Sequence, residues 1–373
     1  MRLITCFLAL LAACAPASHP GGDGGGPGDG GSLDSGAGDA GAADAGTGDA
    51  GPFDAGGDAG AACLPPSLPL QIGSLPAWVE AVPIAASGSE GFVEPSAAEL
   101  SAFEQAFVAL LNGEVAAAQP AFDALGFDLS AFRDASGAGF LVVRERPPGR
   151  AGGTFVVNPR PGRALWLEAP HAGYEAGTVR EGAEALVQLD AVALLVTGAH
   201  RCASSAATPC IGTTTVCGGE YKKSDSAHYP PQFFTSAHRA LRSRFATALA
   251  VSLHGMTPCC GELATVSDGT SRDRPGSISR AFRDRVNARL PPDGGASFSC
   301  NDANDNGRYS ALCGTTDVQG MIDNGSPDAC ATLAGAANDT FLHVEQAPAL
   351  RQAPQPVVDA LGALVFGGDA GCR

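Results

Sequence analysis

Four apolar segments constrain the fold of this chain more than any other feature of its sequence. Each ends in a histidine, an arginine or a glutamate: ALWLEAP precedes His171, VALLVTGA precedes His200 and Arg201, ALAVSL precedes His254, and FLHV precedes Glu345. Near-continuous apolar segments of this length are typical of strands that are buried on both faces of a parallel sheet. Because they alternate with helical patterns, they predict an α/β fold, namely a three-layer α/β/α sandwich with a largely parallel, mixed sheet and disulfide-rich loops.

Hydrophobic periodicity predicts the individual elements of this sandwich. A capping box at Ser96 and Glu99 predicts the start of a helix. Helices are expected over 97–111, 115–125, 178–189, 231–244, 277–290 and 356–366, and strands over 140–143, 154–157, 164–167, 191–197, 247–253 and 341–344. Ligands of open α/β sheets bind outside the carboxyl ends of the strands, so the polar residues at the four strand ends are expected to meet in one site.

The N-terminus resembles a bacterial lipoprotein signal. An apolar run over 3–13 is too short to span a bilayer and suits a signal peptide over 1–13. The run ends Leu-Ala-Ala-Cys, which predicts lipidation of Cys14, whereas an ordinary signal peptide is the alternative. A lipid on this cysteine predicts an exported protein anchored to a membrane, and Ala15 after the cysteine favours the outer membrane of a bacterium.

Residues 14–62 are expected to form a tether. They are almost entirely Gly, Ala, Asp, Ser and Pro, and aspartate recurs every five residues from Asp29 to Asp54. Eight aspartates without Lys or Arg supply half of the net charge of −16, so the segment repels itself and has little to bury. The remainder has no basic excess that would suit nucleic acid. We expect a helical and extended segment over 63–150 and an α/β hydrolase-like domain over 151–373.

Ten cysteines remain after Cys6 in the signal and the lipidated Cys14. They are Cys63, Cys202, Cys210, Cys217, Cys259, Cys260, Cys300, Cys313, Cys330 and Cys372. An even set in an exported chain predicts up to five disulfides without specifying their pairing, although Cys63 and Cys372 bracket the globular part and could join its ends. A cysteine-rich zinc cluster is the alternative, but the chain contains no C-x-x-C pair.

Histidines and carboxylates at the strand ends match the needs of a catalytic zinc site. Such a site takes three protein ligands, an open position for water and a nearby base. His171, Glu175 and His254 are the expected ligands of Zn²⁺, and Glu345 is the expected base. His343 lies two residues before Glu345 on the same expected strand, so it either supports the base or packs against it.

Two arginines and two further histidines are candidate substrate-binding residues. Arg201 is suited to bind a carboxylate through two parallel hydrogen bonds, and Arg351 is a second candidate for that role. His200 is expected to shape the pocket or to hydrogen-bond a ligand. His228, in the segment SDSAHYPPQFF, either lies near the site with Asp225 or is an ordinary loop histidine.

Three short motifs resemble one known family. They are P-H-A-G followed by a carboxylate, a buried strand ending in L-H-G, and a late strand ending in Glu. They are similar to motifs of the zinc-dependent carboxypeptidase-like hydrolases, nearest the N-formylglutamate amidohydrolase and poly-γ-glutamate hydrolase type, over roughly residues 150–350. The resemblance implies an α/β/α sandwich in which His171, Glu175 and His254 hold zinc and Glu345 is the base.

The carboxylate ligand departs from the pattern of that family. Carboxypeptidases place the histidine and the glutamate three residues apart, whereas His171 and Glu175 are four apart. Glu181 and Glu168 are therefore alternative ligands.

These features predict an extracytoplasmic zinc-dependent hydrolase that cleaves an amide bond. Its substrate is expected to carry a carboxylate, as an acyl amino acid, a γ-glutamyl chain or a peptide does. The alternative is a non-catalytic, surface-displayed lipoprotein that binds a ligand. A serine hydrolase is disfavoured because the chain has no G-x-S-x-G motif.

Overall fold

The computed structural model describes the globular part of the chain. It covers residues 64–147, 149–258, 261–292, 294–305 and 312–364. The chain divides into two compact units, Met1–Gly57 and Asp58–Arg373, and all described residues belong to the second. The expected signal peptide, the lipidation of Cys14 and the tether over 14–62 lie outside the described residues.

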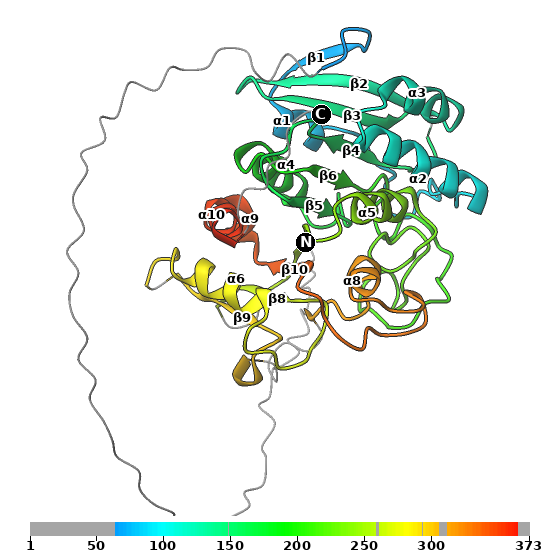
Figure 1. Ribbon diagram of the computed structural model, residues 1–373. Coiled ribbons are helices and arrows are strands. Elements are labelled where there is room, and N and C mark those ends of the chain that lie inside the picture. The colour runs from blue at the N-terminus through cyan, green and yellow to red at the C-terminus, as the bar shows by residue number, and fades with distance from the viewer. Residues whose placement is uncertain (1–63, 148, 259–260, 293, 306–311, 365–373) are drawn as a thin grey trace, which may run out of the picture. The chain divides into compact units, whose positions relative to one another are not determined.

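Ten strands of the described residues form one sheet, in the order β1-β2-β3-β4-β6-β5-β7-β10-β8-β9 (Figure 1). In chain order the strands are β1 (Leu70–Gly73), β2 (Phe127–Asp134), β3 (Gly139–Glu145), β4 (Thr154–Val157), β5 (Leu165–Ala169), β6 (Ala193–Val196), β7 (Leu249–Gly255), β8 (Glu262–Ser267), β9 (Ala296–Ser299) and β10 (Phe341–Gln346). The sheet is mixed, since β6, β5, β7 and β10 run parallel in its centre while β3, β4 and β8 each pair antiparallel with a neighbour. This confirms the predicted α/β class.

Helices cover both faces of this sheet (Figure 1). They are α1 (Leu75–Glu80), α2 (Ala97–Leu111), α3 (Val115–Ala124), α4 (Thr178–Gln188), α5 (Phe233–Arg244), α6 (Ile278–Asn287), α8 (Val318–Asp323), α9 (Pro348–Gln352) and α10 (Gln355–Leu364). One apolar core joins the sheet to α1, α4, α6, α9 and α10, and a second joins the opposite face to α2, α3 and α5. The helix α8 packs beside α5 and against β10.

Alternation along the central strands decides which face each side chain meets. In β5, Leu165 and Leu167 enter the core under α4, whereas Trp166 enters the core under α5. The same alternation in β7 and β10 sends the apolar Leu253 and Val344 toward the α4 face. The intervening polar residues therefore face the side on which α5 and α8 lie.

The predicted helices and strands are present, with their ends displaced by a few residues. The capping box forms as expected: Ser96 Oγ accepts from the backbone N–H of Glu99, whose carboxylate accepts from the backbone N–H of Ser96. Several elements were not expected, among them β2, whose apolar positions are interrupted by Asp128, Ser130 and Arg133. These positions are tolerated because β2 lies near the edge of the sheet, next to β1.

Three disulfides staple the loops around the sheet within the described residues. They join Cys202 to Cys217, Cys210 to Cys330 and Cys300 to Cys313. Cys63, Cys259, Cys260 and Cys372 lie outside the described residues, and so does the possible Cys63–Cys372 pair. Among the helices of the described residues, none is long and apolar enough to cross a bilayer.

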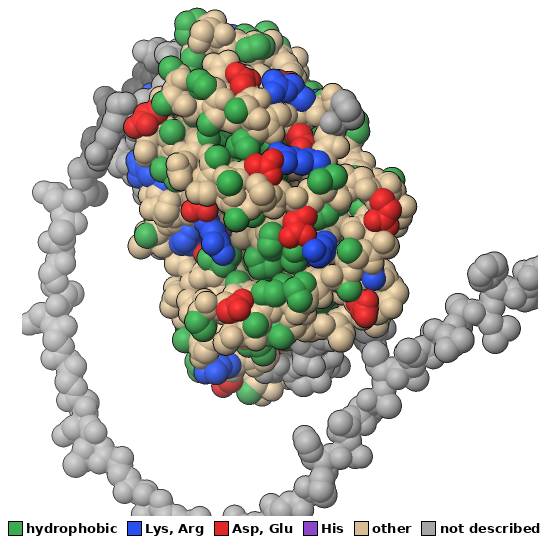
Figure 2. Space-filling view, turned by 90° about the vertical axis from the view of Figure 1, so that its right-hand side faces the viewer, with side chains coloured by type: hydrophobic (Ala, Val, Ile, Leu, Met, Phe, Trp, Pro, Cys, Tyr) green, Lys and Arg blue, Asp and Glu red, His purple; other side chains and the backbone are tan. Residues whose placement is uncertain are grey.

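Figure 2 shows the side of the molecule on which α2, α5 and α8 lie. Acidic and basic side chains are interspersed with apolar ones on it, and no histidine of the described residues is seen there. A groove of about 590 Å³ between α2 and α5 is lined by Leu100, Val108, Pro230 and Pro231 among others. The histidines that concern the candidate site are buried beneath the loops instead.

Candidate metal centre

Two of the three expected metal ligands lie on one helical turn that follows β5. The backbone N–H of Glu175 donates to the carbonyl of His171 at 3.0 Å, which closes the turn. Residues four apart on such a turn project to the same side. The gap of four between His171 and Glu175 therefore brings their side chains together, and His171 Nδ1 lies 2.7 Å from Glu175 Oε1.

The third expected ligand comes from the neighbouring strand. His254 lies near the end of β7, and its Nδ1 is 3.1 Å from His171 Nδ1 and 3.4 Å from Glu175 Oε2. The three side chains are almost completely buried. They form one of three overlapping groups of described residues with ligand atoms close enough to hold a metal ion.

A carboxylate supports the outer nitrogen of each histidine. His171 Nε2 lies 2.9 Å from Asp225 Oδ1, and His254 Nε2 lies 3.4 Å from Asp317 Oδ2 and 2.9 Å from Ser252 Oγ. Metal-binding histidines commonly hold their second nitrogen in this way, which fixes the ring and raises its basicity. The arrangement leaves both Nδ1 atoms facing each other and favours the central group over the two flanking ones.

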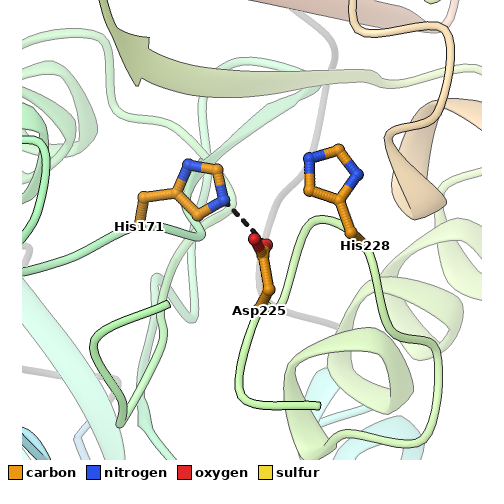
Figure 3. Close-up of side chains that lie close together, drawn as sticks. All are labelled: His171, Asp225 and His228. Carbon is orange, nitrogen blue, oxygen red and sulfur yellow. Dashed lines mark hydrogen bonds and ion pairs between the residues drawn. The ribbon is translucent and has the colours of Figure 1, made fainter. Parts of the chain in front are cut away.

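Asp225 also lies beneath His228 in one of the flanking groups (Figure 3). The rings of His171 and His228 both lie over the Asp225 carboxylate. His228 Nδ1 is 3.0 Å from the carbonyl of Thr316, and Tyr221 stacks on the ring at a centroid distance of 3.6 Å. His228 is thus fixed beside the site. Burial has the largest effect on the His228 ring and lowers its pKa to about 4, so the ring is neutral at pH 7.

The other flanking group contains His254, Asp317 and His343. The rings of His254 and His343 stack with centroids 4.3 Å apart. His343 is almost fully buried, and its Nδ1 has no hydrogen-bond partner among the described residues. Its pKa is lowered to about 3, first by burial and then by the charge of His254. A neutral imidazole is therefore present on both sides of the central group.

Glu345 lies beside His254 because the two residues are register partners in the parallel pair β7–β10. Its side chain is largely buried, and its Oε2 has no hydrogen-bond partner among the described residues. Burial raises the pKa of Glu345 to about 7, with His254 acting in the opposite direction and Glu175 in the same direction. This carboxyl group can therefore both accept and release a proton near neutral pH.

Arg201 is held by two carboxylates of the site, Asp225 and Glu175. Its Nη2 and Nε lie 2.8 and 3.0 Å from Asp225 Oδ2, and its Nη1 lies 3.8 Å from Glu175 Oε1. Burial acts to lower the pKa of Arg201, but Asp225 and Glu175 raise it further. His200 lies next to it at the rim, with the ring of Tyr174 packed edge-on at 5.4 Å.

Arg351 approaches the site from the other face of the sheet. A Cβ on Gly255 would overlap Arg351 Nη1 and would lie 3.1 Å from Glu175 Cβ, and Gly255 projects to the face opposite that of His254. The Nε and Nη1 of Arg351 are buried and have no hydrogen-bond partner among the described residues. On that face Gln346 Nε2 donates to Glu181 Oε2 at 2.8 Å. Burial raises the pKa of Glu181 to about 8, against the opposing effects of its hydrogen bond with Gln346 and of Arg351.

The two alternative carboxylate ligands therefore lie away from the histidine pair. Glu181 is bound to Gln346, behind the strands. Glu168 points under α5, where its Oε1 accepts from Trp166 Nε1 at 2.8 Å and lies 2.6 Å from His238 Nδ1. Of the three candidates, the structure places Glu175 with His171 and His254.

Asp317 and Ser252 were not expected near the site. Asp317 caps the N-terminus of α8, where its side chain accepts from the backbone N–H groups of Gln319 and Gly320. Such a residue before a short helix looks like an ordinary cap in the sequence. Ser252 alternates with His254 on β7, and only this period-two relation could have indicated it.

Two histidine nitrogens and a carboxylate are a donor set that zinc accepts. Tetrahedral ligands about 2.0–2.1 Å from zinc lie about 3.3 Å from one another. His171 Nδ1 lies 3.1 Å from His254 Nδ1, which is close to that separation. It lies 2.7 Å from Glu175 Oε1, while His254 Nδ1 lies 3.4 Å from the other oxygen, Oε2, so His171 and Glu175 would have to separate for both to bind one ion. Burial acts to lower the pKa of both histidines, and Arg201, whose Nη1 lies 3.4 Å from His171 Nδ1, also lowers that of His171. Glu175 and the outer carboxylates nevertheless raise both pKa values above their ordinary value.

Comparisons with known proteins give weak matches. No protein-family profile and no curated protein matches the chain. A solved structure of a bacteriophage poly-γ-glutamate hydrolase is 16% identical, with a TM-score of 0.29, over 55% of this chain and 84% of that one. A candidate metallopeptidase from Shewanella amazonensis SB2B is 12% identical, with a TM-score of 0.25, over 67% of this chain and 91% of that one. The function proposed below therefore depends on the geometry of the site.

Proposed function

We propose that this protein is a zinc-dependent hydrolase that cleaves an amide bond in a carboxylate-bearing substrate outside the cytoplasm. One observation carries the proposal. Two buried histidines meet through their Nδ1 atoms at 3.1 Å beside a carboxylate. A second carboxylate, Glu345, lies on the adjacent strand, and its Oε2 has no hydrogen-bond partner in the part of the chain that the structure describes.

A cation would satisfy the contact between the two histidines. The surrounding carboxylates raise the pKa of His171 and His254, whereas burial and, for His171, the charge of Arg201 lower it. Two protonated Nδ1 atoms cannot face each other across 3.1 Å, so the contact is satisfied either by one N–H···N hydrogen bond or by one ion that accepts both lone pairs. Zinc held by these histidines and Glu175 would polarise a substrate carbonyl and acidify a water molecule.

Glu345 is the base in this proposal. Its carboxylate takes a proton from the attacking water and then delivers that proton to the leaving nitrogen. A pKa near 7 suits both steps, because the group is ready to hold the proton and to release it. His343, on the same face of β10, packs against His254 and so holds the wall of the site next to the base.

The proposed location outside the cytoplasm rests on the cysteines. Three disulfides form within the described residues, and such bonds persist in oxidising compartments. A lipid on Cys14 and attachment to the bacterial outer membrane remain part of the proposal.

Metal analysis of the purified protein tests the ligands, and turnover tests the base. We expect about one zinc per chain, and we expect the His171→Ala and His254→Ala proteins to lose it. Glu345→Gln should keep the zinc and lower the hydrolysis of N-acyl amino acids or γ-glutamyl peptides by about 10²–10⁴-fold. Full zinc content in both histidine variants would refute the ligand set. Bound zinc without turnover of any amide would favour a ligand-binding lipoprotein instead.

A further inference from the structure

A cavity of about 370 Å³ lies at the same edge of the sheet as the candidate metal centre. It opens where β6 and β3 end and where β4 begins, and the segment 82–91 forms its outer wall. Because β4 and β3 run antiparallel in succession from β6, these three strand ends share the edge at which β5 presents His171.

Direct contacts join this cavity to the metal-binding loop. Thr197, in the cavity floor, donates its backbone N–H to the carbonyl of Ala169 at 3.3 Å, two residues before His171. In the outer wall, Ala85 accepts from the backbone N–H of His200 at 2.8 Å. Neighbouring strands lie about 5 Å apart, so the near side of the cavity, at β6, is one strand width from β5, and Arg144, on β3, is three strand widths from it.

The outer wall also touches the turn that carries the ligands. Gly173 has a φ of 77°, and a Cβ there would come within 2.5 Å of Ile84 Cδ1. The wall is therefore packed against the turn between His171 and Glu175. The segment 82–91 therefore borders both the cavity and the metal-binding turn.

The lining of the cavity is mixed and contains one available cation. Val82, Ile84, Ala85 and Val196 contribute apolar surface, and Ser89, Thr154 and Thr197 contribute hydroxyl groups. Arg144 lines the cavity, lies 6.0 Å from the centroid of the Trp78 ring, and makes no ion pair within the residues that the structure describes. We refer to this space as the Arg144 cavity.

The neighbouring charge does not neutralise Arg144. Glu145, which also lines the cavity, accepts from the backbone N–H groups of Arg150 and Gly152 at 3.0 and 2.7 Å. Its other oxygen lies 3.5 Å from Arg150 Nε. Glu145 is thus satisfied by its own loop, and the positive charge of Arg144 remains open to a ligand.

A carboxylate-bearing substrate needs such a charge. Arg201 is bound to Asp225. Arg351 lies behind the metal-binding turn, beside the backbone of Gly255 and near Glu175 Cβ, and it does not line the cavity. Arg144 is an arginine at the catalytic edge whose guanidinium is uncommitted among the described residues.

We propose that the Arg144 cavity binds the end of the substrate remote from the scissile bond, and that this end is an apolar group terminating in a carboxylate. The inference rests on the proposed function only in identifying the ligand as a substrate, because the cavity binds its ligand without metal or turnover. An apolar chain fills the space lined by Ile84 and Val196, and its carboxylate pairs with Arg144.

Calorimetric titration with acetate, butanoate and hexanoate tests this binding. The titrations use the intact protein and the His171→Ala variant, in which the metal centre cannot hold the anion. We expect hexanoate to bind more tightly than acetate, by up to about fourfold for each added methylene. Arg144→Gln should weaken hexanoate binding by about 10–100-fold, since it removes a charge-assisted hydrogen bond.

Arg146→Gln is the matched control. Arg146 lies two residues along, pairs with Asp123 and Asp128 at the surface, and does not line the cavity, so its loss should leave binding unchanged. Ala86→Phe keeps Arg144 and places a ring at the cavity mouth, and it should weaken hexanoate more than acetate.

Two outcomes would overturn the inference. One is wild-type hexanoate binding by Arg144→Gln. The other is loss of binding in His171→Ala with Arg144 intact, which would place the anion at the metal centre. Absence of zinc or of hydrolysis would refute the proposed function and leave the titration result standing, so the two failures are distinguishable.

Discussion

His171 and His238 lie on the same face of one sheet, and each is buried between two carboxylates. His171 is 2.7 Å from Glu175 and 2.9 Å from Asp225. His238, on α5, is 2.6 Å from Glu168 and 3.0 Å from Asp323. Both histidines therefore have the same number of carboxylate neighbours, and this number does not show which of them binds a metal.

The difference is in the neighbours beyond the two carboxylates. Both nitrogens of His238 meet a carboxylate, and Arg242 pairs with Asp323 and stacks over Trp166, while Glu168 Oε2 has no hydrogen-bond partner among the described residues. Burial acts to lower the pKa of His238, but Asp323 and Glu168 raise it to about 10, and the ring carries its own positive charge.

His171 also meets a carboxylate at each nitrogen, but its Nδ1 lies 3.1 Å from Nδ1 of His254 as well. Within the described residues, Glu175 Oε2 and Glu345 Oε2 have no hydrogen-bond partner either. A buried histidine between carboxylates is therefore a structural ion pair where no second histidine approaches it. It becomes a candidate ligand when a second histidine competes for the same space.

The largest expected effect separates folding from metal binding. His238→Ala leaves Glu168 and Asp323 buried without their shared cation, and we expect it to lower the free energy of unfolding by about 3–5 kcal/mol. Denaturant unfolding measures this loss. The zinc affinity of the folded variant should stay unchanged, and a folded His238→Ala protein without zinc would contradict the comparison.

Two buried glutamates provide the next test. A four-ligand zinc site binds with about 10–16 kcal/mol, so one ligand contributes roughly 3–4 kcal/mol. We therefore expect Glu175→Gln to weaken zinc binding by a factor on the order of 10²–10³, as measured by competition with a chelator.

Glu181→Gln is the control for Glu175→Gln. Glu181 is equally buried but is bound to Gln346 on the other face of the sheet, so its amide should leave the zinc affinity within about threefold of wild type. The reverse ranking of the two variants would show that Glu181 is the ligand.

The smallest expected effect is a decrease, as the pH rises, in the contribution of His238 to the free energy of unfolding. Because the pKa of His238 is raised from 6.5 to about 10 in the folded protein, its contribution to stability is complete below pH 6.5 and is lost as the pH rises toward 10. The loss is at most about 1.4 kcal/mol per pH unit. Unfolding at pH 7, 8 and 9 measures it as the difference between wild type and His238→Ala. A difference that is constant over this range would show that His238 is neutral.

The sequence predicted the parts of the molecule that depend on local pattern. Buried strands ending at His171, His254 and Glu345 could be located because apolar runs and their polar ends are local features. The one uncertain ligand, Glu175, was uncertain because the helical turn after β5 could not be seen in the sequence. That turn makes a spacing of four suitable.

Asp225 and Asp317 could not be predicted as partners of the site histidines for a different reason. Asp225 was considered only as a loop neighbour of His228, and Asp317 was not considered at all. They reach the histidines from loops that are 54 and 63 residues away along the chain. Arg144 and Arg201 could be told apart only by their partners, since nothing in the sequence shows that Arg201 is bound to Asp225.

The sequence by itself determined the α/β class, the strands, and the edge at which their polar ends gather, because burial on both faces leaves an apolar run that can be recognised locally. Only the tertiary structure decided which polar groups close on one another. It paired His238 with Glu168 and Asp323, and it brought His171 against His254. The physical reason is that desolvation makes each buried polar group depend on its partners, and those partners come from elements far apart in the chain.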